Sequence, residues 1–293
     1  MYVLKKLFPI FLGILLAFML AGCNQTAKTV DKESSTGNKE EQKKEEKISE
    51  LTLEEVLNKS MEASEQLKSF TVAMEMDQQL SSDQEETSMD LSSTIDMQVV
   101  TEPMAFYQKM KMTEKASKES FEVESYFTQD GMYLYDAAAG KWMKFPTEFS
   151  DQLLQLSDQQ TNPAEELKKL QKFVDDFTFE QDDKTYILKL KASGDKFSDF
   201  IKEMAQQSLP PQMGAGEEIM DQMKVNQLEY EIIIAKDTFY PTHLNIMMDM
   251  EISADGQKVK MAQSVKGQYS NYNNVGEITV PQEVLDTAEE IEM

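Results

Sequence analysis

Apolar and polar residues alternate with a period of two over much of this chain. In "FTVAMEMD" the apolar positions are Phe70, Val72, Met74 and Met76. Successive side chains of a β-strand point to opposite faces, so the pattern predicts a strand with one apolar face. The same alternation predicts further strands at 89–99, 104–112, 121–127, 131–136, 140–145, 177–179, 186–190, 228–235, 244–252 and 259–269.

Helical spacing replaces this alternation in a few segments. Thr52 is a suitable N-cap, and Glu55 three residues later completes a capping box. Apolar residues then recur every three or four positions as far as Leu67, which predicts an amphipathic helix. Further helices are expected at 148–172, 193–211 and 216–224, and a short one after Pro281.

The order of these elements predicts an α+β fold. Helices interrupt the strands too irregularly for βαβ units, so a parallel doubly wound sheet is not expected. Consecutive alternating strands favour an antiparallel meander with one buried and one solvated face. We therefore expect residues 48–293 to form a single domain, a large curved antiparallel sheet (a half-open β-barrel) wrapped over helices. Two smaller α+β halves are the alternative.

The first 47 residues have a different composition. Lys5 and Lys6 precede an apolar run at 7–20, which is typical of a secretory signal and short for a membrane span. The following "LAGC" resembles the bacterial lipobox and ends in Cys23, the only cysteine of the chain. This resemblance implies a signal peptide at 1–22, a lipidated Cys23 and anchoring on the extracytoplasmic face of the cell membrane. An ordinary signal peptide with an incidental cysteine is the alternative.

Residues 23–47 combine the anchor with a polar segment. From Asn24 onward this segment has no aromatic residue and hardly any aliphatic one. Too little apolar surface is available to offset the entropy of ordering, so we expect a disordered tether.

Charge and residue usage exclude several classes of function. After removal of 1–22, 27 basic residues face 53 acidic ones, a net charge of −26, so nucleic acid is not an expected partner. All 29 basic residues are lysines, which leaves no arginine for a phosphate or carboxylate clamp. His243 is the only histidine, and no catalytic, nucleotide-binding or metal-binding motif occurs. We expect no enzyme, no metal and no cofactor.

Several phrases carry a family resemblance. The lipobox, the polar tether, the amphipathic helix and the long strands resemble the LolA/LppX-type lipoproteins. "GMYLYDAAAGKWMKF", "DTFYPTHLNIMMDM" and "YSNYNNVGEITVPQEV" also look like an uncharacterised lipoprotein group of Gram-positive bacteria. The resemblance implies a half-open β-barrel whose concave side encloses a lipid or another apolar ligand. The lack of arginine leaves no evident clamp for a lipid headgroup.

Methionine is the unusual apolar residue of these strands, with 19 in the mature chain. It is flexible and polarizable, and therefore suits a wall that repacks around variable ligands. We expect a ligand groove lined by Met74, Met76, Met89, Leu91, Met97, Phe106, Met110, Met112, Met248 and Met250. Ordinary core packing of the same residues is the competing interpretation, and a sacrificial role in oxidation is a weaker one.

Three functions follow from these observations. The first is an anchored binder of a lipid or another apolar ligand, acting as carrier or sensor. The second is a protein-interaction or structural module of the envelope, for which Tyr269, Tyr272, Phe239 and Tyr240 are candidate contact residues. The third, a hydrolase using paired carboxylates, has almost no support, because 53 acidic residues form pairs by chance.

Overall fold

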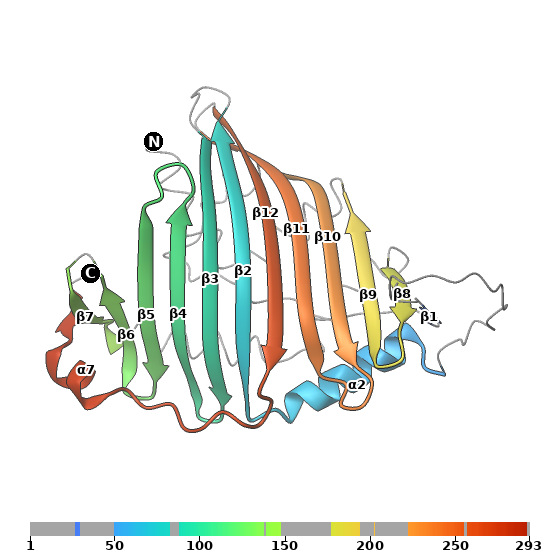
Figure 1. Ribbon diagram of the computed structural model, residues 1–293, viewed down its shortest axis with the longest axis horizontal. Helices are drawn as coiled ribbons and strands as arrows, with labels where there is room; N and C mark the ends of the chain where they lie inside the picture. The colour runs from blue at the N-terminus through green and yellow to red at the C-terminus, as the bar shows by residue number, and fades with distance from the viewer. Residues whose placement is uncertain are drawn as a thin grey trace, which may run out of the picture.

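The computed structural model describes residues 27–29, 50–82, 88–137, 139–147, 177–193, 202, 222–254 and 257–291. These residues form one sheet of thirteen strands that does not close, in the order β1-β8-β9-β10-β11-β12-β2-β3-β4-β5-β6-β7-β13 (Figure 1). The strands are β1 Lys28–Thr29, β2 Ser69–Ser82, β3 Ser88–Thr101, β4 Met104–Glu114, β5 Ser120–Thr128, β6 Gly131–Asp136, β7 Lys141–Lys144, β8 Phe177–Gln181, β9 Thr185–Ala192, β10 Met223–Ala235, β11 Pro241–Ala254, β12 Gln257–Ser270 and β13 Glu289–Glu290. The described helices are α2, Leu53–Glu65, and α7, Gln282–Thr287.

Two antiparallel meanders combine into this one sheet. Strands β2 to β7 pair in chain order, and so do strands β8 to β12. The last strand of the second meander then pairs with the first strand of the first, in a ladder that runs from Val259 opposite Ser82 to Ser270 opposite Thr71. The predicted single large antiparallel sheet is therefore confirmed, and the alternative of two separate halves is wrong.

The register of the strands separates an apolar face from a polar face. Met76 lies opposite Ser93 on β3 and opposite Val265 on β12, and Val265 lies opposite Ile246 on β11. Directly opposed residues of an antiparallel pair point to the same side. We call the side that carries Met76 the inner face and the other side the outer face.

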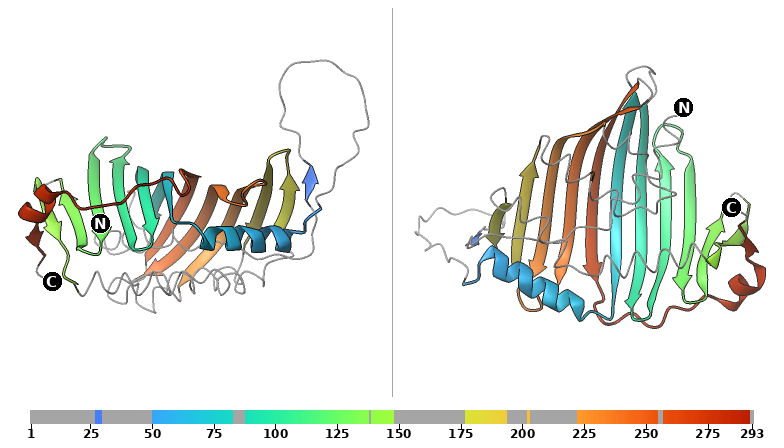
Figure 2. Two further views of the ribbon diagram at one scale, coloured as in Figure 1. Left: turned by 90° about the horizontal axis from the view of Figure 1, so that it is seen from below. Right: turned by 180° about the vertical axis from the view of Figure 1, so that it is seen from behind.

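Helix α2 covers part of the inner face. Thr52 accepts a hydrogen bond from the Glu55 backbone N–H (3.2 Å), and the Glu55 carboxylate accepts one from the Thr52 N–H (2.8 Å), so the predicted capping box is confirmed. Leu53, Val56 and Leu57 are at most 1% exposed and pack into a cluster formed mainly by β2 and β8–β12. Figure 2 shows α2 lying across the strands at this end of the sheet.

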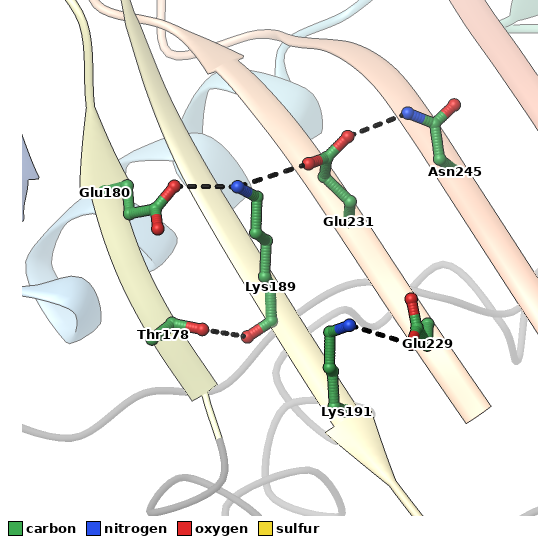
Figure 3. A network of polar contacts seen from close by, with 7 residues as sticks. All are labelled: Thr178, Glu180, Lys189, Lys191, Glu229, Glu231 and Asn245. Carbon is green, nitrogen blue, oxygen red and sulfur yellow. Dashed lines mark hydrogen bonds and ion pairs between the residues drawn. The ribbon is translucent and has the colours of Figure 1, made fainter. Parts of the chain in front are cut away.

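The outer face is held by cross-strand polar contacts. Lys189 on β9 contacts Glu180 (2.7 Å) and Glu231 (3.8 Å), and the Asn245 side chain donates to Glu231 (2.9 Å) (Figure 3). The hydrogen bond to Glu180 raises the pKa of Lys189. Lys191 forms a second ion pair with Glu229 at 2.8 Å. Such partly exposed pairs contribute little each, but opposite charges on facing positions fix the register of the strands.

Three short segments differ from the expectations. Residues 27–29 lie within the expected disordered tether, yet Ala27 is fully buried and Lys28–Thr29 pair with β8. Met223 and Lys224 belong to β10, although the pattern at 216–224 predicts a helix. The expected short helix after Pro281 is confirmed as α7, and the chain then adds β13 beside β7, which the pattern did not predict.

Several expected segments lie outside the described residues. These are the signal peptide at 1–22, Cys23, most of the tether, the helix at 148–172 and nearly all of the helix at 193–211.

Candidate ligand-binding face

All ten residues of the expected groove lie on the inner face. On β2 and β3, Met74 lies opposite Ile95 and Leu80 lies opposite Met89, which places the even residues of β2 with the odd residues of β3. The pairing of β3 with β4 extends this inner face on one side, and the pairing of β2 with β12 and of β12 with β11 extends it on the other. The ten residues are Met74, Met76, Met89, Leu91, Met97, Phe106, Met110, Met112, Met248 and Met250.

Burial divides these ten residues into two groups of five. Met76, Leu91, Met110, Met248 and Met250 are at most 9% exposed. The other five, Met74, Met89, Met97, Phe106 and Met112, are half-buried. Three of the buried methionines belong to the cluster beneath α2, namely Met76, Met248 and Met250, so core packing describes that part of the face correctly.

The other half of the inner face retains partly exposed apolar side chains. Val123 lies opposite Met110, Leu134 opposite Ser125, and Met143 opposite Leu134, so β5, β6 and β7 continue the face. We define the half-buried patch as eight of the half-buried apolar residues of β2 to β7 on this face: Met74, Met97, Phe106, Met112, Val123, Met132, Leu134 and Met143. Phe121, opposite Met112, extends the patch and is 47% exposed.

Four members of this patch, Val123, Met132, Leu134 and Met143, are not among the ten expected groove residues. Met132, Leu134 and Met143 come from strands of six and four residues, and a pattern that short assigns no face by itself. Only the ladder from β5 to β7 places them beside the longer strands.

Few charged residues lie on the inner face. Strands β2, β3, β5 and β12 place no charged residue on it, β4 places only its last residue, Glu114, and β6 and β7 place Asp136 and Lys141, which lie opposite each other at the far end of the face. The uncharged strands between favour apolar surface of a ligand over an ionic headgroup. Among the described residues, no group of three or more His, Cys, Asp or Glu side chains is arranged to hold a metal ion.

The aromatic residues considered for protein contact are half-buried in pairs. Tyr240 and Tyr272 lie with ring centroids 4.6 Å apart, Tyr269 lies 6.3 Å from Phe70, and Phe239 stacks on Tyr186 at 6.2 Å. Burial raises the pKa of Tyr269 to about 12. These pairings stabilise the strand ends, so none of the four side chains presents the exposed contact that the interaction hypothesis requires.

A second aromatic cluster lies on the outer face. Tyr126 contacts Tyr107 (4.6 Å between centroids) and Trp142 (5.6 Å), and the Tyr107 hydroxyl donates to Glu124 at 2.6 Å. Tyr133 in the same region is buried against Val280 and Val284 of the C-terminal segment. The cluster therefore packs the tail onto the sheet, on the side opposite the half-buried patch.

His243 lies on the outer face. Its neighbour Leu244 is buried in the core cluster, whereas His243 is half-buried with its ring Nδ1 3.0 Å from the Thr242 hydroxyl. His243 therefore points away from the apolar inner face.

The expectation of membrane attachment comes from the sequence alone. No helix within the described part of the chain is both long enough and apolar enough to span a bilayer. Cys23, the expected lipidation site, lies outside the described residues.

Comparisons with known proteins identify a family. A model described as "Family of unknown function (DUF6612)" matches residues 52–289. No curated protein matches the chain. Among solved structures, LprF from Mycobacterium bovis is similar at 13% identity and a TM-score of 0.38, over 78% of this chain and 94% of that one.

Two further solved structures show weaker likeness. A DUF1329 family protein from Desulfovibrio piger matches at 10% identity and a TM-score of 0.25, over 76% of this chain and 92% of that one. A β-barrel-like protein of the domain of unknown function DUF1849 from Brucella abortus matches at 10% identity and a TM-score of 0.22, over 68% and 97%. The resemblance to LolA/LppX-type lipoproteins and to a Gram-positive group stays a prediction.

Proposed function

Because the chain belongs to this family of unknown function, we infer its role from the surface of the sheet, and we propose that it is an envelope lipoprotein that binds a lipid or another apolar ligand. In this proposal the half-buried patch holds the ligand, and lipidated Cys23 anchors the protein on the extracytoplasmic face of the membrane. The protein acts as a carrier or sensor and has no enzymatic activity.

One observation carries the proposal. The inner face continues from the core beneath α2 to β7. Among the described residues, its apolar side chains on β8 to β11 are buried, whereas those on β2 to β7 include many that are half-buried. Five of the eight residues of the patch are methionines, whose flexible side chains accommodate ligands of different shape. A contiguous apolar surface that stays partly open is a common mark of a ligand site.

The direct test is binding of an apolar fluorescent dye, N-phenyl-1-naphthylamine, to the mature chain. Cys23 is replaced in the tested protein (Cys23→Ser), so that the acyl chains of the anchor neither bind the dye nor occupy the patch. We expect saturable dye binding that Met112→Asp weakens about tenfold or more, because a carboxylate in an apolar site is costly to desolvate.

Met247→Asp is the matched control for this test. Met247 lies on β11 but points to the outer face, where it is 54% exposed. We expect Met247→Asp to bind the dye like the unsubstituted chain. Absence of saturable binding, or equal binding by both variants, would contradict the proposal.

A further inference from the structure

Three buried polar side chains lie close together on the apolar inner face. Gln78, Ser93 and Gln263 are 5%, 2% and 7% exposed. Gln78 lies directly opposite Gln263, and Ser93 lies opposite Met76, two residues before Gln78. The three therefore sit on adjacent positions of the same face, and we call them the polar spot.

The polar spot has unused hydrogen-bonding groups. Gln263 donates through Nε2 to the sulfur of Met76 at 3.3 Å, a weak acceptor. Its carbonyl oxygen Oε1 and the Ser93 hydroxyl are fully covered and lack a partner within the described part of the chain. Buried amide oxygens and hydroxyls are nearly always hydrogen-bonded in native proteins, because leaving them unpaired is costly. These two groups therefore point to a molecule that supplies the missing bonds.

The position of the polar spot connects it to the half-buried patch. Ser93 lies opposite Met112, a member of the patch, and Met74, another member, lies on the same face two residues before Met76. Met76 itself belongs to the core cluster. The polar spot thus lies at the border between the filled half of the inner face and the half-buried patch, and a ligand on the patch reaches its covered groups when a neighbouring methionine side chain, such as Met112, turns aside.

We infer that the ligand of the patch is an apolar molecule that carries a neutral hydroxyl group; this inference rests on the proposed function. A carbonyl oxygen such as Gln263 Oε1 only accepts, so the ligand has to donate. An ester or ether has no donor, and a carboxylate brings a charge to β2, β3, β4 and β12, the strands around the polar spot, which place no lysine on this face. A hydroxyl both donates and accepts, which matches Gln263 Oε1 and the Ser93 hydroxyl together.

Dye displacement by three oleyl compounds tests this inference. 1-Monooleoylglycerol and oleyl alcohol carry hydroxyls, whereas methyl oleate has a chain of the same length and no donor. We expect at least one of the two hydroxyl compounds to bind about five- to tenfold more tightly than methyl oleate, the usual gain from a neutral hydrogen bond. Tighter binding of 1-monooleoylglycerol alone would identify the ligand as a glycerolipid. Equal affinity for 1-monooleoylglycerol and oleyl alcohol would identify it as a simple long-chain alcohol.

Variants of the polar spot separate recognition from packing. Ser93→Ala and Gln263→Met keep the volume of the face while removing its unpaired groups. We expect both to abolish the preference for hydroxyl compounds and to leave the affinity for methyl oleate unchanged. Ser92→Ala and Gln268→Met, on the outer face of the same strands, serve as matched controls and keep the preference.

Thermal unfolding of the ligand-free variants provides the second readout. Removing unpaired buried groups is expected to leave the midpoint unchanged or higher. A lowered midpoint in both variants, or equal affinity of the original chain for all three compounds, would overturn the inference while the proposed function stands. Failure of all three compounds to displace the dye would overturn both.

Discussion

Met250 and Met97 offer a matched test of the division between filled core and half-buried patch. Met250 on β11 is fully buried beneath α2, and Met97 on β3 is half-buried in the patch. Both are methionines on long strands of the same inner face, so replacement of each by alanine removes the same atoms. Only the packing around those atoms differs.

The expected losses of folding free energy differ by about threefold. Met250→Ala leaves a cavity in a closed core, and such substitutions cost about 2–5 kcal/mol. Met97→Ala removes apolar surface that is already partly in contact with solvent, so only part of the transfer free energy, about 1 kcal/mol, is lost. At this chain length, a loss of about 3 kcal/mol lowers the unfolding midpoint by roughly 6–12 °C.

Urea unfolding followed by the fluorescence of Trp142 measures both losses. Trp142 packs in the outer-face aromatic cluster, away from the patch, so it reports on unfolding of the sheet. Dye binding by the two folded variants completes the assay, with a weaker signal expected only for Met97→Ala. Equal destabilisation by the two substitutions would refute the reasoning, since it would mean that the patch is as tightly filled as the core.

Three further predictions concern other parts of the molecule. Thr52→Ala removes the capping box of α2 and is expected to cost about 1 kcal/mol in urea unfolding, whereas Thr52→Ser retains it; equal stability of the two would count against the cap. Burial raises the pKa of Tyr107 and Tyr126 to about 12, so the folded state keeps their protons longer than the unfolded one, and stability should hold below pH 10 and fall between about pH 10 and 12. Tyrosinate absorbance that rises near pH 10 without unfolding would contradict this. Ala27→Asp should release β1 and speed tryptic cleavage after Lys28 while the unfolding midpoint changes little; an unchanged cleavage rate would show that β1 does not protect the site.

Local sequence signals were sufficient for the regular elements. The capping box at Thr52 and Glu55 fixes the start of α2, because both partners lie within one turn. Alternation placed all ten expected groove residues on one face, because the period of a strand determines the side of every residue in it. The single large sheet followed from the number of consecutive alternating segments.

Long-range contacts explain what the sequence left open. Alternation identifies an apolar face but not what covers it, so it did not separate the buried Met250 from the half-buried Met97. Strands β1 and β13 contain two residues each, too few for any pattern, and they exist because the edges β8 and β7 offer free backbone groups. The polar spot depends on the pairing of β12 with β2, which brings together residues 185 positions apart.

The most direct test of the account is native mass spectrometry of the mature protein isolated from its own cells. We expect a mass above that of the chain and its covalent anchor, caused by an apolar hydroxyl-bearing molecule that organic solvent extracts. We also expect that Met112→Asp isolated in the same way lacks this molecule. A bare mass for the unsubstituted protein, equal to that of the chain with its anchor alone, would contradict the claim that the half-buried patch holds a ligand.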